Sequence, residues 1–362
     1  MSATSVPYPG VRRVPVAAIA EYPDRIDVRS PSEFALDHVP GATSHPVLDD
    51  AERTRIGTLH AASAFEARKA GAAVVARNIA AMIESEFLDR PRDWRPLVYC
   101  WRGGQRSRAL VQVLQEIGWR AAQLEGGYRA YRRHVVAEIA RLPQRFRYVV
   151  ICGLTGSGKS RLLAALADAG AQVLDLEGIA RHRGSVLGGK PDEEQPSQKL
   201  FESRLLEALS RLDPAQRVFV ESEGRRIGAV QMPDALLEAM RAGRALTLVT
   251  PREARVALLK DEYAHFFAAP DAVGACLKPL TELHGKAKIA RWEAMAARGD
   301  WEALIGELLD AHYDPIYTRS LRRNFAAEAR VIETRSADAA AFAELARGVL
   351  TGIEDEDIVE NP

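Results

Sequence analysis

One cysteine of this chain stands where a predicted strand gives way to a helix. Cys100 directly follows the apolar run at residues 97–99, and a loop with two adjacent glycines separates it from an amphipathic helical pattern. The glycines let backbone N–H groups point inward around the sulfur and form an anion-binding concavity. These donors, the helix N-terminus, Arg102 and Arg106 all favour the thiolate. The sequence therefore predicts a nucleophilic Cys100, surrounded by the other residues of its loop: Trp101, Gly103, Gly104, Gln105 and Ser107.

A second segment has the pattern of a phosphate-binding loop. Residues 153–160 match G-x-x-x-x-G-K-S in full and lie between an apolar run and a helical pattern, which is the context that this motif requires. Lys159 can supply charge to terminal phosphate oxygens, and Ser160 can ligate Mg²⁺. The pattern predicts affinity for a phosphate chain, not the use of ATP. The residues predicted to bind a diphosphate are Gly153, Thr155, Gly156, Ser157, Gly158, Lys159 and Ser160.

Charged residues follow two neighbouring strand-like runs in the same region. The loops at the carboxyl ends of parallel strands meet at the ligand crevice, so these residues are candidates for the same site. Asp175 and Glu221 can orient Mg²⁺ or a water molecule, and each can equally cap the helix that follows it. Four arginines can stabilise a leaving diphosphate or contact an RNA phosphate, or lie at the surface: Arg181, Arg183, Arg225 and Arg226. No His or Cys falls at metal-ligand spacing, so no metal site of that kind is predicted.

The composition indicates a globular protein, and the alternation of strand-like and helical patterns described below indicates an α/β fold. The chain has 362 residues, 47% hydrophobic and 27% charged, which predicts two or three domains with buried cores. This composition excludes a disordered chain, three cysteines cannot support a disulfide scaffold, and no run approaches the roughly 20 apolar residues that span a bilayer. The first residues lack the apolar core of a secretory signal. We therefore expect a cytoplasmic protein with no membrane partner.

Short β-branched runs alternate with helical patterns, which is typical of parallel sheets. The first region has candidate strands at 26–28, 97–99 and 121–124, and its helix after Cys100 has a predicted apolar face and ends at Gly118: Leu110, Val113, Leu114 and Ile117. The second region has five candidate strands, which predict a doubly wound sheet: 148–152, 173–176, 218–220, 246–249 and 331–332. The segment 281–323 is predicted to be helical.

The two regions are predicted to be separate domains. Pro143 ends a helical pattern shortly before the strand at 148, which places a boundary there. The expected limits are 12–137 for the first domain, 138–147 for a basic linker, and 148–350 for the second domain with its helical C-terminal part. Basic and acidic residues balance at 49 each, but residues 128–148 carry six arginines and one acid. That cluster fits either an RNA backbone contact or a solvated helix.

The first region resembles the rhodanese family over residues 12–137. The resemblance rests on four segments: 27–34, 38–42, the Cys100 loop and 124–128. Members of that family carry sulfur as a persulfide on the loop cysteine. Five residues separate Cys100 from Arg106, one more than in the common sulfur-transferring loop. The wider loop suits a tetrahedral oxyanion, so the spacing alone leaves phosphatase and chalcogen-transfer chemistry open.

A rhodanese-like region followed by a phosphate-binding loop strongly resembles the tRNA 2-selenouridine synthases, up to about Arg323. The motifs that carry this resemblance are 99–107, 153–160, 175–178 and 182–185. It implies replacement of sulfur by selenium in the wobble 2-thiouridine of tRNA, with selenophosphate as donor and a geranylated intermediate made from geranyl diphosphate. It also implies an S-selanyl intermediate on Cys100, with Arg102 and Arg106 holding the donor's phosphate. No tightly bound cofactor is expected, and Mg²⁺ is left open.

Two other functions fit the residues without the resemblance. One is a phosphatase and kinase hybrid, which would release phosphate from a generic aryl phosphate. The other is a sulfur-relay or RNA-binding adaptor, in which the phosphate-binding loop acts as a nucleotide switch. Nucleotide-dependent partner binding without any change in tRNA would favour the adaptor.

Overall fold

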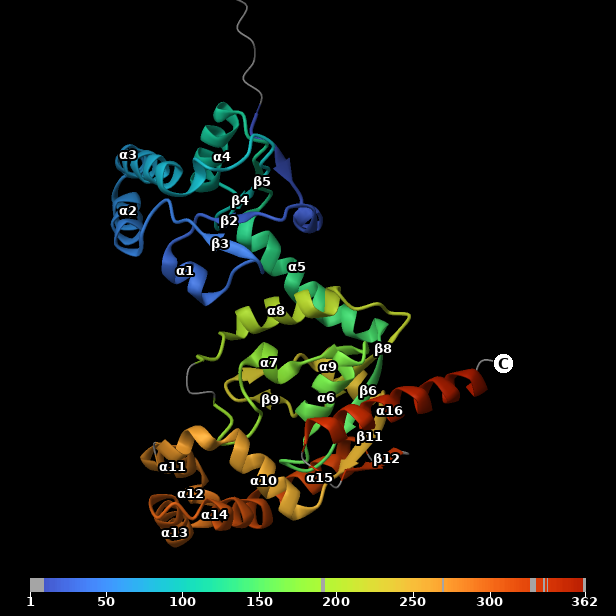
Figure 1. Cartoon of the computed structure of the whole chain (residues 1–362). Coiled ribbons are helices and arrows are strands. Elements are labelled where there is room, and N and C mark those ends of the chain that lie inside the picture. The colour runs from blue at the N-terminus through green and yellow to red at the C-terminus, as the bar shows by residue number, and fades with distance from the viewer. Residues whose placement is uncertain are drawn as a thin grey trace, which may run out of the picture. The chain divides into compact units, whose positions relative to one another are not determined.

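The computed structural model describes residues 10–189, 193–268, 270–325, 330–334, 336 and 338–360. The chain divides into two compact units, Met1–Glu138 with Glu202–Arg204, and Ile139–Phe201 with Leu205–Pro362 (Figure 1). The segment expected to be a linker consists of the end of helix α5 (Gly127–Arg141), a 3-10 turn (Leu142–Arg145) and the start of strand β6. The limits of the two domains remain predictions. Among the described residues, no helix combines the length and apolar character that crossing a membrane requires.

The first unit is built on a five-stranded parallel sheet in the order β1-β5-β4-β2-β3. Its strands are β1 (Arg13–Val14), β2 (Arg25–Asp27), β3 (Ala42–Ser44), β4 (Leu97–Tyr99) and β5 (Ala122–Leu124). Its helices are α1 (Pro31–Leu36), α2 (Asp50–Ala62), α3 (Ala64–Met82), α4 (Gln105–Ile117) and α5. The three predicted strands are confirmed to within a residue, and β4 lies at the centre because all three of its residues are apolar and buried.

The buried face of α4 differs from the prediction. Leu110 and Leu114 are buried as expected, but Val113 is 37% and Ile117 51% exposed. The helix instead buries Ser107, Leu110, Val111 and Leu114. These positions have the i, i+3, i+4, i+7 spacing of one helix face, and its first member is polar. The predicted C-cap is confirmed, since Gly118 adopts the left-handed conformation with φ of 108°.

The second unit contains the predicted doubly wound sheet, in the order β12-β11-β6-β8-β7 with all pairs parallel. Its strands are β6 (Arg147–Cys152), β7 (Gln172–Leu174), β8 (Arg217–Glu221), β11 (Arg244–Val249) and β12 (Arg330–Glu333). The chain leaves the central strand β6 to one side for β7 and β8 and returns to the other for β11. This reversal opens a crevice at the carboxyl ends of the strands. A short antiparallel pair, β9 (Arg226–Ile227) and β10 (Val230–Gln231), was not predicted.

Helices cover this sheet and form a further core. Around the sheet lie α6 (Lys159–Asp168), α7 (Leu176–Ala180), α8 (Gln198–Ser210), α9 (Asp234–Arg241) and α16 (Ala339–Glu360) (Figure 1). The remaining helices are α10 (Arg252–Glu262), α11 (Pro270–Leu277), α12 (Thr281–His284), α13 (Lys286–Ala297), α14 (Trp301–Leu308) and α15 (Asp314–Asn324). They pack around Trp292, Leu304 and Leu308, which are all at most 2% exposed. The predicted helical segment 281–323 is therefore confirmed.

Candidate functional site

The sulfur of Cys100 lies at the carboxyl end of β4 and accepts two hydrogen bonds. The backbone N–H of Gly104 donates from 3.3 Å, and the hydroxyl of Ser107 donates from 3.1 Å. The Gln123 amide donates to the Ser107 oxygen at 2.8 Å, so that oxygen already accepts one bond and its own proton is available to the sulfur. Donors of this kind stabilise negative charge on the sulfur. Cys100 itself is only 3% exposed, so the loop covers it.

The other predicted loop residues lie around this sulfur in different ways. Arg102 and Gln105 are exposed, and the ring of Trp101 lies 5.1 Å from that of Tyr128. Arg106 forms an ion pair with Glu33 of α1 at 2.9 Å. Burial alone would raise the pKa of Glu33, but the hydrogen bond and the charge of Arg106 hold it below its usual value. Arg106 is thus fixed beside the loop, whereas Arg102 points to solvent.

A buried polar network supports the loop from the neighbouring strand β2. Arg29 and Asp27 form an ion pair at 2.6 Å, and both side chains are at most 1% exposed. The guanidinium of Arg29 also lies 4.0 Å from the centre of the Tyr128 ring, and the Tyr128 hydroxyl donates to Asp37 at 2.7 Å. Burial, followed by the bond to Asp37, raises the pKa of Tyr128. Asp27, Arg29 and Tyr128 belong to the rhodanese-like motifs, and Asp37 lies between two of them.

The start of α5 lies directly on the Cys100 loop. The N–H groups of Tyr128 and Arg129 donate to the carbonyls of Cys100 and Trp101, at 2.9 and 3.0 Å. Gly127 has a φ of 56°, and a Cβ atom there would lie 2.2 Å from the Cys100 carbonyl oxygen. Only glycine permits this approach.

Replacing Gly127 by alanine should therefore unfold or distort the loop. We expect Gly127→Ala to lower the free energy of unfolding by about 2–4 kcal/mol, because strained backbone and a backbone clash combine. Chemical denaturation would measure the change. Gly104→Ala is the matched control, since no atom lies within 4 Å of a Cβ there, and it should change stability by less than about 0.5 kcal/mol. Equal stability of the two variants would contradict the role of this contact.

The phosphate-binding loop of the second unit runs from β6 to the first turn of α6. Lys159 begins the helix, and its ammonium group donates to the carbonyl of Gly153 at 3.2 Å. Arg255 donates to the Thr155 carbonyl at 2.9 Å, and Thr250 donates to the Ser157 carbonyl at 2.7 Å. These bonds fix the loop from α10 and from the residue that follows β11. The surrounding fold therefore holds the loop in place.

A cavity of about 310 Å³ lies against this loop. Five of the predicted diphosphate-binding residues line it, and Gly153 and Ser157 do not: Thr155, Gly156, Gly158, Lys159 and Ser160. Of the predicted supporting residues, Asp175 and Arg183 line it as well. Glu177, Gly178 and Ser185 of the predicted motifs at 175–178 and 182–185 line it too, as does Glu223, which lies between the predicted Glu221 and Arg225. Residues that the sequence did not indicate complete the wall: Leu259, Glu262, Tyr263 and Tyr317. Several of these come from α10 and α15, so no local sequence signal could have found them.

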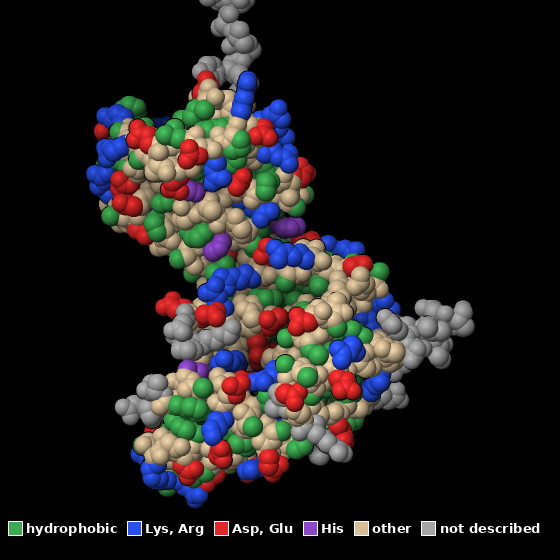
Figure 2. All heavy atoms as spheres, in the orientation of Figure 1, with side chains coloured by type: hydrophobic (Ala, Val, Ile, Leu, Met, Phe, Trp, Pro, Cys, Tyr) green, Lys and Arg blue, Asp and Glu red, His purple; other side chains and the backbone are tan. Residues whose placement is uncertain are grey.

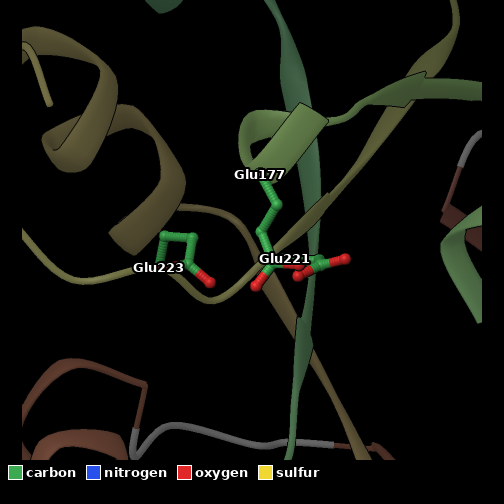
Figure 3. Close-up of side chains that lie close together, drawn as sticks. All are labelled: Glu177, Glu221 and Glu223. Carbon is green, nitrogen blue, oxygen red and sulfur yellow. The ribbon is translucent and has the colours of Figure 1, made fainter. Parts of the chain in front are cut away.

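Three glutamates meet at this site. One oxygen from each of Glu177, Glu221 and Glu223 lies within 4.8 Å of the others, as Figure 3 shows. Burial, followed by repulsion between the carboxylates, raises the pKa of Glu177 to about 9 and that of Glu223 to about 7. Burial also raises the pKa of Glu221 to about 7, against the attraction of Lys159. Both Glu221 oxygens lack a hydrogen-bond partner among the described residues.

This cluster has the donor set that Mg²⁺ prefers. Its ligands are carboxylate oxygens, and the hydroxyl of Ser160 lies 3.2 Å from a Glu177 oxygen. Two buried, unpartnered oxygens on Glu221 are costly unless a cation or a proton neutralises them. The cluster therefore fits a divalent cation. Glu221 was a predicted site residue. Glu177 belongs to the predicted motif at 175–178 and Glu223 lies two residues after Glu221, but neither was assigned a role.

The remaining predicted charges have other roles. The Asp175 carboxylate accepts the N–H of Gly178 at 2.8 Å and caps α7, which is the alternative that the sequence left open. Arg181 forms an ion pair with Glu193 at 3.4 Å, and Arg225 pairs with Asp234. Neither of them lines the cavity, and nor does Arg226. Only Arg183 of the four arginines reaches it.

Magnesium should bind this cluster and release protons. At pH 7 we expect Mg²⁺ to raise the free energy of unfolding by on the order of 1–3 kcal/mol at saturating concentration. Because the carboxyl pKa values are raised, the cation must displace protons, and titration calorimetry in two buffers of different ionisation enthalpy would count them. Glu221→Gln should lose both effects, whereas the exposed control Glu116→Gln should keep them. Stabilisation that is identical in all three proteins would contradict a site at the cluster.

Fold and site together define a class of protein, a rhodanese-like unit with a strand-end cysteine joined to a phosphate-binding α/β unit. Residues 17–134 match the family model of the rhodanese-like domain. Residues 146–272 match the family model described as the tRNA 2-selenouridine synthase AAA domain. Both matches confirm the predicted fold class.

Relatives extend this similarity over most of the chain. A tRNA 2-selenouridine synthase of Shewanella loihica is 36% identical over 326 residues, covering 81% of this chain and 85% of that protein. One from Sulfurovum sp. is 32% identical over 330 residues, covering 83% and 89%. One from Nitrosomonas europaea is 35% identical over 259 residues, covering 70% and 66%. The chain belongs to the tRNA 2-selenouridine synthase family, and the resemblance noted in the sequence is confirmed.

Proposed function

We propose that this chain is an enzyme that converts the wobble 2-thiouridine of tRNA into 2-selenouridine. It does so in two steps, through an S-geranylated intermediate, with geranyl diphosphate and selenophosphate as co-substrates. Family membership supports the overall reaction. The observation that carries the assignment of residues is the Cys100 sulfur, which accepts hydrogen bonds from Gly104 and Ser107 in a unit separate from the phosphate cradle.

The first step belongs to the phosphate-binding loop. The sulfur at C2 of the base forms a bond to C1 of the geranyl group, the C–O bond to the diphosphate breaks, and the base loses its N3 proton to solvent. Negative charge grows on the departing diphosphate. Lys159, the loop N–H groups and the guanidinium of Arg183 line the cavity where that charge would be stabilised. One nitrogen of Arg183 is buried without a partner among the described residues, so a phosphate oxygen would satisfy it.

A cation would assist at the same place. Glu177, Glu221, Glu223 and Ser160 are the residues that would hold Mg²⁺, which would add positive charge next to the diphosphate oxygens when bound. We therefore propose that Mg²⁺ aids the binding of the diphosphate.

The second step belongs to the Cys100 loop. Selenium from hydrogen selenophosphate forms the C2–Se bond, the C2–S bond breaks, and geranylthiol leaves with a proton. Water accepts the phosphoryl group, and the proton that it releases returns to N3 of the base. The exchange is redox-neutral overall, because selenium enters and sulfur leaves in the same divalent reduced state. We assign the role of nucleophile in this transfer to Cys100. Arg106 and Arg102 are then the cations nearest to the donor's phosphate. The geranylthiol group leaves C2 more readily than an unalkylated thiocarbonyl sulfur would. This difference explains why geranylation precedes selenium transfer.

Mass spectrometry of tRNA nucleosides tests this proposal. Incubation with geranyl diphosphate alone should give S-geranyl-2-thiouridine, and later addition of selenophosphate should convert it to 2-selenouridine. A nucleoside profile that neither reagent changes would overturn the proposal. Phosphate release from an aryl phosphate with unchanged tRNA would favour the phosphatase alternative.

A further inference from the structure

A second cavity of the phosphate-binding unit is lined by arginines. It has a volume of about 540 Å³ and shares Glu223 with the first cavity. Its cations come from the segment between β8 and β9, from the last residue of α9 and from two positions on α15: Arg225, Arg241, Arg319 and Arg323. Figure 2 shows acidic side chains in a hollow of this unit with basic side chains at its margin.

The fold does not neutralise this charge. Arg225 pairs with Asp234, but both side chains are about two-thirds exposed, so the pair is weak. Arg241, Arg319 and Arg323 form no ion pair with a carboxylate among the described side chains, and all three are exposed. A cation is favourable near a helix C-terminus, which explains Arg241 and Arg323 as individual residues. This effect does not account for four arginines around one cavity whose lining, among the described residues, includes a single carboxylate, that of Glu223, because like charges repel one another unless an anion lies between them.

The shape of the cluster fits a chain of phosphates. Arg319 and Arg323 are one helical turn apart, so both guanidinium groups rise from the same face of α15. Each guanidinium can donate two parallel hydrogen bonds to a phosphate. Asn324 and Phe325 line the same cavity. An aromatic ring and an amide beside arginines are the groups on which unpaired RNA bases stack and form hydrogen bonds.

We propose that this arginine cavity binds the phosphodiester backbone of the RNA substrate beside the nucleoside that is alkylated in the first cavity. The inference rests on the proposed function, because it takes RNA as the substrate of this unit. Glu223 is part of both cavity walls, so an unpaired strand held by the arginines would present its next base to the phosphate-binding loop. Backbone contacts of this kind give affinity and position without reading sequence.

The test is RNA binding by an arginine pair variant. Arg319→Gln with Arg323→Gln should weaken binding of a fluorescent tRNA that carries 2-thiouridine by about tenfold. The slope of log affinity against log salt should fall by about 1–2, because two phosphate contacts are lost. Binding of geranyl diphosphate, followed by calorimetry, should not change. Lys286→Gln with Arg298→Gln removes the same charge from the first residue of α13 and from its C-cap, and should leave RNA binding as in the natural chain.

The outcomes separate this inference from the proposed function. RNA affinity and salt slope equal to those of the α13 control would overturn the inference, whatever the chain does to tRNA. Loss of geranyl diphosphate binding instead of RNA binding would overturn it as well, because the cavity would then serve the small donor. The expected loss of RNA binding, seen with a natural chain that selenates no tRNA, would support the inference and overturn the function. Arg319→Lys with Arg323→Lys should recover the salt slope, since the charges return.

Discussion

Cys100→Ser should abolish formation of 2-selenouridine while S-geranyl-2-thiouridine accumulates. The hydroxyl that replaces the thiol is a far weaker nucleophile, and loss of an enzyme nucleophile costs at least about 10³-fold in rate. The geranylation step should keep its rate, because it uses the phosphate-binding loop. Mass spectrometry of nucleosides from one tRNA pool, sampled over time with both co-substrates present, measures both steps together.

The chain provides a matched control for this substitution. Cys276 is partly buried in the helical region, at neither cavity, and Cys276→Ser should retain both activities. The structure already holds Ser107 and Gly104 as donors around position 100, so a serine there fits without new strain. Loss of both activities in Cys100→Ser would mean that the steps share one site. Full selenation in that variant would remove Cys100 from the mechanism.

Much of the fold follows from local patterns in the sequence. The buried strands β4, β6 and β8 are short apolar runs, and such runs predict strands when glycine or polar residues bound them. Strands β1 and β3 were not predicted, because they have two and three residues and no apolar run. They exist because their neighbours supply hydrogen-bonding partners along the sheet. The sequence cannot show such tertiary pairing.

The site, like the fold, could be predicted only in part from the sequence. The Cys100 loop and the phosphate-binding loop are contiguous, so their residues and spacing were visible before the structure. The acidic cluster was not, because Glu177 follows β7 while Glu221 ends β8 and Glu223 follows it, and only the parallel pairing of these strands brings them together. The prediction of the buried face of α4 was wrong for a related reason. Ser107 is buried there because it donates to a sulfur seven residues earlier, and a hydropathy pattern assigns a serine to the surface.

Lys159→Ala should block the reaction before selenium is used. The ammonium group of Lys159 lies against the loop carbonyl of Gly153 and lines the cavity, so its removal takes away the positive charge nearest to the departing diphosphate. Removing one such group from a preorganised site costs about 10²–10³-fold in rate. Geranyl diphosphate should also bind more weakly by calorimetry. Lys286→Ala, an exposed lysine of α13, is the control and should change neither quantity.

With tRNA that already carries the geranylated intermediate, the same variant tests which unit catalyses which step. When tRNA already carries S-geranyl-2-thiouridine, Lys159→Ala should convert it to 2-selenouridine at the natural rate, because the Cys100 loop is untouched. Cys100→Ser should fail with the same tRNA. If Lys159→Ala still geranylates unmodified tRNA at the natural rate, the phosphate cradle is not where the diphosphate leaves. If it fails even on pre-geranylated tRNA, Lys159 acts in selenium transfer too, and the assignment of one step to each unit is wrong.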